Sequence, residues 1–506
     1  MRLTLAAVGF AIAAGLSAFA GVGHAQPAAP QVTISSGALA GVRDGDVISF
    51  KGVPFATPPV GELRWRPPQP VKPWRGVRAA DKHGSLCQQK YNPGDNGVGP
   101  LPMSEDCLTL NVFAPEGAKR LPVMVWIHGG GFVNGSGTAA LYDGAALARQ
   151  GVVVVTLNYR LGRFGFLAHP ALTAEAKAEP VGNYGLMDMI AALKWVRANI
   201  GRFGGDPQQV TIFGESAGGI AVNDLMASPA ARGLFAKAIA QSGLGRETTL
   251  PLPAAEKSGE AFAKQVGLSN ATAADLRKLT SEQILKAGDP DIRAGGGSMA
   301  DGKILPMSPA DAFAKGLEAK VPYVVGWNSL EFPAPAADVE KFIGAVAAAN
   351  PRVSDIEASY PDRETYLTHV VSDLLFTEPA LALAAMHAGN GAPTWVYRFS
   401  VLSPAMRGVL KGAPHASERQ YVFQTLKTSP WPTDANDAVQ AKTMSAYWAA
   451  FAKDGDPNDA GQPNWPRYDR ARDRILDFSN DGPSVVTTPR RKAMDAIAEL
   501  NPGNTK

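Results

Sequence analysis

Continuous apolar runs alternate with helical patterns through the middle of the chain. Two runs, 123–127 and 152–157, are rich in β-branched residues, which is typical of strands buried on both faces of a sheet. Between residues 186 and 200 the apolar positions recur at helical spacing, and the following Gly201 predicts that the helix ends there. Further strands are predicted at 210–213, 237–241, 321–325 and 394–400. The pattern therefore predicts an α/β protein with a large, mostly parallel central sheet flanked by helices.

Two stretches, 250–320 and 333–390, are richer in helical patterns and are expected to leave the sheet as helical excursions over the active site. No linker of low complexity and no repeat of fixed period divides the chain. Residues 26–506 are therefore predicted to form a single domain. Only 19% of the 506 residues are charged, which suits a sheet that is buried on both faces.

Composition excludes two large classes of protein. The 49 basic and 46 acidic residues give a net charge of +3, and the basic residues are scattered. The densest basic cluster, 490–492, is expected to begin a helix rather than to follow a phosphate backbone, so we expect no nucleic-acid partner. Mean hydropathy is −0.07, and no stretch after residue 25 approaches the roughly 18 apolar residues of a membrane span. The second excluded class is therefore that of polytopic membrane proteins.

Residues 1–25 have the pattern of a signal peptide. A basic residue precedes an apolar run, and Gly23-His24-Ala25 places small residues where a signal peptidase reads them. An N-terminal anchor helix is the alternative, but Gly15, Gly21 and the shortness of the run disfavour it. We therefore expect export to the periplasm or the medium, with residues 26–506 as the mature protein.

The chain has two cysteines, Cys87 and Cys107. In an oxidising compartment a bond between them would close one short loop and contribute about 3 kcal/mol on the chain-entropy model. Two buried thiols are the alternative. No second Cys-x-x-Cys and no His pair stands at ligand spacing, so no metal site is predicted.

Residues 214–218 read Gly-Glu-Ser-Ala-Gly, the only G-x-S-x-G in the chain. The motif lies between a strand ending at Phe213 and a helix starting near Ala217, which is the setting of a nucleophile elbow. The flanking glycines let strand and helix pass closely around so sharp a turn. A glycine-rich turn with an incidental serine is the alternative; the placement favours Ser216 as a nucleophile.

Residues 128–132 read His-Gly-Gly-Gly-Phe and follow the strand that ends at Ile127. Glycines here allow backbone N–H groups to converge on one point, as acyl transfer requires where the carbonyl oxygen becomes negative. The N–H of Ala217, beside the nucleophile, would complete this oxyanion hole. A phosphate loop is excluded because no Gly-Lys-Ser/Thr follows.

A serine nucleophile needs a base, and three histidines follow the elbow. His369 stands in a helical pattern and His387 near a helix end, where a cation suits the helix dipole. His415 lies in a loop beyond the strand 394–400, and loops after strands often carry function. His415 is therefore the predicted base.

The base needs an orienting carboxylate, for which Glu331, just past the strand 321–325, is the best candidate. Its rivals are Asp301, which is better explained as a turn former, and Glu418, which is better explained as a structural partner. The order Ser216, Glu331, His415 is the order of nucleophile, acid and base in α/β-hydrolases.

Motifs along nearly the whole mature chain resemble those of the type-B carboxylesterases, the family of the bacterial carboxylesterases and the cholinesterases. They are 50–56 with 58–61, 104–108, 111–112, 128–132, 158–160, 203–207, the elbow, 447–448, 451–452 and 455–458. The resemblance implies an α/β-hydrolase fold without metal or organic cofactor. It implies a catalytic triad of Ser216, Glu331 and His415. It also implies an oxyanion hole formed by Gly130, Gly131 and Ala217, and a disulfide between Cys87 and Cys107.

Two residues depart from the family pattern. Phe332 follows the predicted acid and Ala416 follows the predicted base, where the family often has glycine. Phe332 could displace a loop or line the substrate pocket. We expect that pocket near Phe132, residues 250–300 and residues 333–410, with Trp327, Phe332 and Phe376 as candidate lining residues.

The predicted activity is hydrolysis of a small-molecule carboxylic ester through an acyl-enzyme on Ser216, with water as co-substrate. The same triad could act on amides, thioesters or lactones, because these substrates share the nucleophile and the oxyanion hole. A non-catalytic binding protein is the alternative from another class, and the presence of every reacting residue disfavours it.

Overall fold

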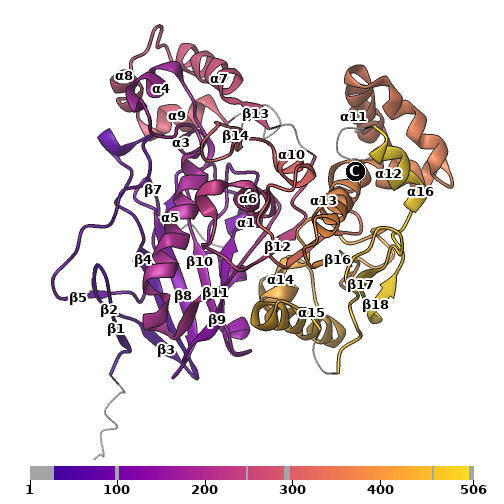
Figure 1. Ribbon diagram of the computed structural model, residues 1–506, viewed down its shortest axis with the longest axis horizontal. Coiled ribbons are helices and arrows are strands. Elements are labelled where there is room, and N and C mark those ends of the chain that lie inside the picture. Colours follow the sequence, from indigo (N-terminus) through magenta and orange to yellow (C-terminus); the bar gives the residue numbers. More distant parts are fainter. Residues whose placement is uncertain (1–27, 97–101, 247–248, 290–296, 459–460, 501–506) are drawn as a thin grey trace, which may run out of the picture.

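The computed structural model describes residues 28–96, 102–246, 249–289, 297–458 and 461–500. The predicted signal peptide, residues 1–25, lies outside the described part. Within that part the main sheet has eleven strands in the order β18-β17-β16-β15-β12-β11-β9-β10-β8-β4-β3 (Figure 1). Their bounds are β3 Val42–Asp44, β4 Val47–Pro54, β8 Thr109–Pro115, β9 Leu121–Ile127, β10 Val153–Leu157, β11 Gly205–Glu215, β12 Lys237–Gln241, β15 Tyr323–Asn328, β16 Thr394–Phe399, β17 Ile475–Ser479 and β18 Gly482–Val486.

The centre of the sheet is parallel and its edges are antiparallel. Strands β10, β9, β11, β12, β15, β16 and β17 pair in parallel, in that spatial order. Strands β8, β4 and β3 at one edge and β18 at the other are antiparallel to their neighbours. The prediction of a mostly parallel sheet is confirmed, and the carboxyl ends of its central strands share one edge, where open α/β sheets place their sites.

Both faces of the sheet are covered by helices, which explains the continuous apolar runs. Along β9, Val123, Val125 and Ile127 belong to the core shared with α5 (Tyr184–Asn199) and α6 (Ala217–Ala227). Met124 and Trp126 belong to the second core, shared with α15 (Ala435–Asp454). Alternate side chains of one strand thus serve opposite layers.

The local predictions differ from the observed bounds by a few residues. The helix expected at 186–200 begins earlier, at Tyr184, and the strand expected at 321–325 is shifted to Tyr323–Asn328. The carbonyl of Pro322 accepts a hydrogen bond from the backbone of Ala238 at 3.0 Å, but a proline has no N–H for a strand ladder. The strand therefore begins after it.

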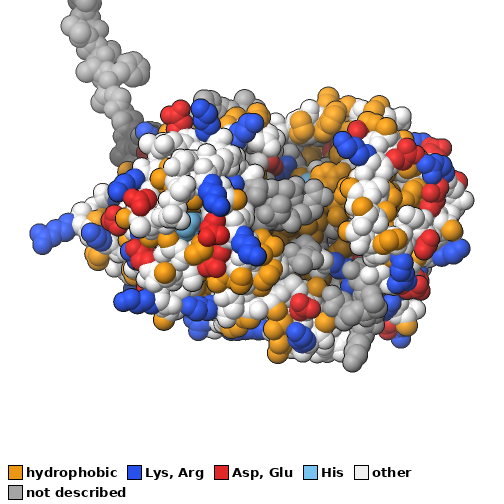
Figure 2. Space-filling model, turned by 90° about the horizontal axis from the view of Figure 1, so that it is seen from above, with side chains coloured by type: hydrophobic (Ala, Val, Ile, Leu, Met, Phe, Trp, Pro, Cys, Tyr) orange, Lys and Arg blue, Asp and Glu red, His pale blue; other side chains and the backbone are white. Residues whose placement is uncertain are grey.

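The two expected excursions rise above the carboxyl ends of the parallel strands (Figure 1). Figure 2 looks down on this face, where hydrophobic side chains gather around a hollow. The first excursion comprises β13 (Leu250–Pro251), α7 (Leu252–Gln265), α8 (Ala273–Arg277), α9 (Ser281–Ala287), β14 (Met299–Ala300) and α10 (Pro309–Ala314). The second comprises α11 (Ala336–Ala349), α12 (Arg363–Ser372), a π-helical turn (Asp373–Thr377) and α13 (Glu378–Gly389).

The remaining elements are short. A small sheet joins β1, β2 and β5, and β6 pairs with β7 next to the disulfide between Cys87 and Cys107, which the structure contains as the resemblance implies. Their bounds, with those of the short helices, are β1 Gln31–Ile34, β2 Gly37–Ala40, β5 Val77–Ala79, β6 Leu86–Cys87, β7 Met103–Ser104, α1 Pro93–Asn96, α2 Ala145–Ala148, α3 Gly162–Gly165, α4 Pro170–Ala176, α14 Arg419–Val422 and α16 Arg491–Ala498.

Among the described residues, one continuous helical stretch, Arg363–Gly389, is long and apolar enough to cross a membrane by length and composition. However, 67% of its most apolar window is buried inside the protein, as in the core helix of a soluble protein.

Candidate active site

Ser216 lies at the turn between the end of β11 and the start of α6. Its backbone has φ 56° and ψ −123°, a strained conformation for a residue with a side chain. A Cβ at Gly218 would collide with the carbonyl oxygen of Ile127, so only glycine lets α6 pass β9 this closely. The local geometry is that of a nucleophile elbow.

His415 and Glu331 come together next to this turn, although 84 residues separate them in the chain. His415 Nδ1 lies 2.6 Å from Glu331 Oε2, and the backbone N–H of His415 donates to the carbonyl of Glu331 at 2.8 Å. Glu331 is completely buried. The histidine ring is thus held at its Nδ1 edge, leaving Nε2 for chemistry.

The other carboxylate oxygen of Glu331 is also held. Its Oε1 accepts hydrogen bonds from Ser242 Oγ and from the backbone N–H of Asn328, both at 2.7 Å. Ser242 follows β12, which pairs with β15, and the sequence patterns did not identify it. These donors fix the orientation of the carboxylate and, through it, of the imidazole.

The rival carboxylates have structural roles. Glu418 accepts hydrogen bonds from the side-chain amides of Gln241 at 3.1 Å and Asn328 at 2.7 Å. Asp301 Oδ1 accepts from the backbone N–H groups of three residues that follow it, at 2.8–2.9 Å, as a turn former does. Neither carboxylate is hydrogen-bonded to His415.

The rival histidines lie away from the elbow. His387 is completely buried between Glu318, 2.9 Å from its Nδ1, and the carbonyl of Val321, 2.8 Å from its Nε2. His369 is on α12, and burial lowers its pKa to about 4. Of the three candidates, only His415 lies next to Ser216.

A second carboxylate faces the histidine from the elbow itself. Glu215 Oε1 lies 3.2 Å from His415 Nε2, the nitrogen that must serve Ser216. Burial raises the pKa of Glu215. Burial lowers the pKa of His415, but the negative charges of Glu215 and Glu331 outweigh burial, so the pKa of His415 is raised overall. Within the described chain, Ser216 Oγ makes no hydrogen bond to His415, a contact that often tightens only when substrate binds.

Arg419 connects this cluster to the disulfide loop, residues 87–107. Its guanidinium donates to Asp95 Oδ1 and to the hydroxyl of Tyr142, both at 3.1 Å, and lies 4.0 Å from Glu215 Oε2. Its Nε donates to the carbonyl of Ala416 at 3.0 Å. One buried cation thus contacts the loop, the elbow and the residue after the histidine.

The predicted oxyanion donors lie at the same place. Gly130 and Gly131 have φ values of 99° and 63°, and Ala217 is the first residue of α6. Within the described chain, the backbone N–H groups of Gly130 and Gly131 have no acceptor. All three residues line one cavity together with Ser216 and His415.

This cavity has a volume of about 560 Å³ and a mainly apolar wall. Phe332, 44% exposed, lies with its ring centroid 4.9 Å from that of His415, and Phe376 lies at 5.2 Å. Trp327 is in the core instead. The wall is completed by the second excursion, and, contrary to expectation, none of the described residues between 250 and 300 lines it. The apolar wall residues are Val133, Ile220, Leu244, Phe332, Phe342, Val371, Leu375 and Phe376.

Comparison with known proteins places this site in a family. The model of the carboxylesterase family matches residues 28–359 and 345–497. The chain belongs to the carboxylesterase family. It is 40% identical over 470 residues to the fumonisin B1 esterase of Sphingopyxis macrogoltabida, covering 88% of this chain and 85% of that protein. It is also 40% identical over 460 residues to the para-nitrobenzyl esterase of Bacillus subtilis strain 168, covering 86% and 92%.

The solved structures of this carboxylesterase family agree. A PNB esterase superposes with a TM-score of 0.82 at 35% identity, over 92% of this chain and 99% of that one. The chain is therefore a carboxylic ester hydrolase with the α/β-hydrolase fold. Sequence reasoning about the esterase missed Ser242, Glu215 and Arg419 as members of the site; Glu215, inside the elbow motif, had the clearest signal.

Proposed function

We propose that this carboxylesterase cleaves esters through an acyl-enzyme on Ser216, with His415 as base and Glu331 as the orienting acid. The observation that carries the proposal is the contact of 2.6 Å between His415 Nδ1 and Glu331 Oε2, beside an elbow serine on the same cavity. A carboxylate at Nδ1 fixes the tautomer whose free Nε2 accepts a proton, and it stabilises the imidazolium that then forms.

The reaction has two balanced halves. Ser216 Oγ attacks the ester carbonyl as its proton passes to His415 Nε2, and the carbonyl π electrons move onto the oxygen. The tetrahedral intermediate collapses, the C–O bond to the alcohol breaks, and His415 returns the proton to the leaving oxygen. Water then attacks the acyl-enzyme in the same way and releases the acid and free Ser216.

The negative oxygen formed in both halves would be held by the N–H groups of Gly130, Gly131 and Ala217. Fixed backbone donors of this kind act without reorganisation, and the loss of one typically costs about 10²–10³ in rate. The absence of another acceptor for the Gly130 and Gly131 N–H groups, within the described chain, supports this role.

The cavity wall supports a substrate with an apolar acyl or alcohol group and no negative charge. Phe332, Phe376 and their apolar neighbours offer burial, while Asp95 and Glu215 are carboxylates on the same wall. Among its described lining residues there is no lysine or arginine to pair with an anionic substrate. An acyl carboxylate would therefore meet two carboxylates and no lysine or arginine among the described lining residues, which is costly.

Ser242 provides a matched control for the nucleophile, because it is a second serine that lines the same cavity. Ser216→Ala is expected to abolish hydrolysis of a p-nitrophenyl ester and labelling by an organophosphonate in a folded protein. Ser242→Ala is expected to retain labelling. Hydrolysis retained by Ser216→Ala would overturn the proposal. Parallel assays with an amide, a thioester and a lactone would detect the alternative substrates.

We also propose that the enzyme is exported and that residues 1–25 are removed. The disulfide between Cys87 and Cys107 supports this, since such bonds persist in oxidising compartments. The N-terminal sequence of enzyme recovered from the periplasm or medium is expected to begin at Gln26. Intact residues 1–25 on an enzyme found only in the cytoplasm would contradict the proposal.

A further inference from the structure

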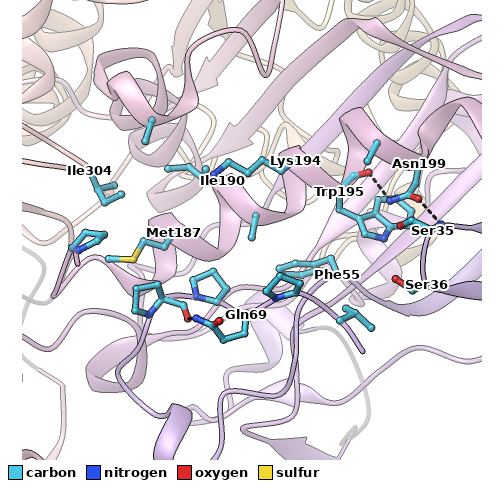
Figure 3. Close-up of a pocket in the computed structure, with 18 of the residues that line it drawn as sticks. Ser35, Ser36, Phe55, Gln69, Met187, Ile190, Lys194, Trp195, Asn199 and Ile304 are labelled. Atoms are coloured by element: carbon cyan, nitrogen blue, oxygen red, sulfur yellow. Dashed lines mark hydrogen bonds between the residues drawn. The ribbon is translucent and has the colours of Figure 1, made fainter. Parts of the chain in front are cut away.

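A second groove lies between helix α5 and the proline-rich segment 67–73 (Figure 3). Its volume is about 630 Å³, and no residue lines both this groove and the catalytic cavity. Single small-molecule ligands occupy pockets of about 300–1,000 Å³. The groove is therefore large enough for a ligand of its own.

The first wall of the groove is one continuous stripe of α5. The lining positions recur at intervals of three or four residues, which places them on one face of the helix, and they span about 18 Å at about 1.5 Å per residue. All but two of them, Lys194 and Asn199, are apolar. They are Met187, Ile190, Ala191, Lys194, Trp195, Ala198 and Asn199.

The opposite wall contains prolines 67, 68, 70 and 73, which have no N–H to donate and a restricted backbone. Some of its carbonyls are already occupied. The carbonyl of Pro67 accepts from Gln69 Nε2 at 3.0 Å, and that of Pro70 accepts from Thr57 Oγ1 at 2.6 Å. This wall is preformed and offers a ligand mainly apolar contact.

Besides Lys194, the polar side chains that line the groove are Ser35, Ser36, Gln69 and Asn199. Asn199 accepts from the backbone of Ser35 and donates to the carbonyl of Trp195, both at 3.0 Å, so its amide is satisfied (Figure 3). The indole N–H of Trp195 is buried and has no partner within the described chain.

Lys194 is the sole charged residue among the described residues that line the groove. Its side chain is exposed and extends along α5 toward Ile190 (Figure 3). Within the described chain its ammonium makes no hydrogen bond or ion pair. A cation without a partner beside two apolar walls is complementary to a ligand with one negative group and a long apolar body.

We propose that this groove binds an amphiphilic anion, an alkyl chain between α5 and the proline-rich segment with its carboxylate beside Lys194. A peptide is disfavoured because its backbone amides would face the mainly apolar side chains of α5 and prolines that have no N–H, and would lose their hydrogen bonds to water. The site is separate from ester hydrolysis and does not depend on the proposed triad.

The site is located with a decanoic acid that carries a photoreactive diazirine, cross-linked to the full enzyme whose Ser216 has been blocked by a phosphonate. Cross-links are expected in peptides that contain residues 67–73 or 187–198. The same blocked enzyme is titrated calorimetrically with decanoate and with decan-1-ol. Cross-links confined to other regions, or no binding of decanoate, would overturn the proposal.

Variants then test the two halves of the ligand separately. Lys194→Met is expected to weaken decanoate binding about threefold to fivefold, as for an exposed ion pair, and to leave decan-1-ol binding unchanged. Ala191→Phe fills the groove from α5 and is expected to abolish binding of both. Lys257→Met, an exposed lysine on α7 outside the groove, is the matched control. An equal effect of the two lysine variants would refute the role of Lys194.

Discussion

Glu215 Oε1 lies 3.2 Å from Nε2 of His415, on the side of the imidazole opposite to Glu331. The elbow residue that precedes the nucleophile therefore faces the same nitrogen that the proposed mechanism uses. The histidine is positioned between two carboxylates, one that orients it at Nδ1 and one that raises its pKa from the Nε2 side.

The charge of Glu215 should be visible in the pH dependence of catalysis. Because this carboxylate raises the pKa of His415, Glu215→Gln should lower it, and the base should become available at lower pH. The acidic limb of kcat/KM is expected to move to lower pH, by about one unit. Glu340→Gln, an exposed position on α11, is the control and should leave the profile in place. An acidic limb of Glu215→Gln at the same pH as in the unmodified enzyme, or at higher pH, would contradict the expected effect of Glu215 on the pKa of His415.

Glu331→Gln should lower kcat by about 10³–10⁴-fold with little change in the melting temperature. The amide oxygen can still accept from Ser242 and the backbone of Asn328, but the NH₂ group then faces His415 Nδ1 and favours the wrong tautomer. Glu418→Gln tests the rival carboxylate and should lose far less activity. Comparable losses in the two variants would assign no special role to Glu331.

Arg419 should stabilise the disulfide loop and preserve the cavity wall. Arg419→Met leaves Asp95 without its guanidinium partner and is expected to cost about 3 kcal/mol, the scale for breaking a largely buried pair. Since Asp95 lines the cavity, KM should rise as well. Arg419→Lys should recover part of both effects. Calorimetric melting measures the loss of stability, and steady-state kinetics measure KM. An unchanged melting temperature in Arg419→Met would refute the stabilising role of the ion pair between Arg419 and Asp95.

Ala416 carries a backbone strain that glycine would remove. Its φ is 65°, in the left-handed region where a Cβ costs about 1–2 kcal/mol. Ala416→Gly should therefore raise the free energy of unfolding, and with it the melting temperature. The expected gain is up to about 1 kcal/mol, because the greater freedom of glycine in the unfolded chain offsets part of the relieved strain. Ala413→Gly, in the same loop and without positive φ, should lower the melting temperature. A fall in the melting temperature of both variants would contradict the backbone strain at Ala416.

The charges of the cavity should discriminate against anionic esters. The p-nitrophenyl ester of butanoic acid should have a kcat/KM at least about tenfold above that of the p-nitrophenyl monoester of succinic acid, whose free carboxylate meets Asp95 and Glu215. Asp95→Asn should narrow the difference, whereas Asp46→Asn, a remote exposed acid, should not. Equal rates for the two esters in the unmodified enzyme would refute the proposed charge preference.

Features that depend on residues close together in the sequence could be predicted from the sequence alone. The apolar runs predicted the strands β9, β10, β11, β12, β15 and β16 because both faces of the sheet are covered, and the glycines around Ser216 predicted the sharp turn between β11 and α6. The order of Ser216, Glu331 and His415 then indicated which carboxylate and histidine to expect at one edge of the sheet.

Only the tertiary structure determined which side chains contact one another across long separations. Ser242 and Glu331 are 89 positions apart, and Asp95 and Arg419 are 324 apart, so no local pattern links them. The same holds for the groove between segment 67–73 and α5. Hydrophobic periodicity reports which face of an element is buried, but hydrogen bonds, ion pairs and pKa shifts depend on distances of a few ångströms between elements, which only their packing sets.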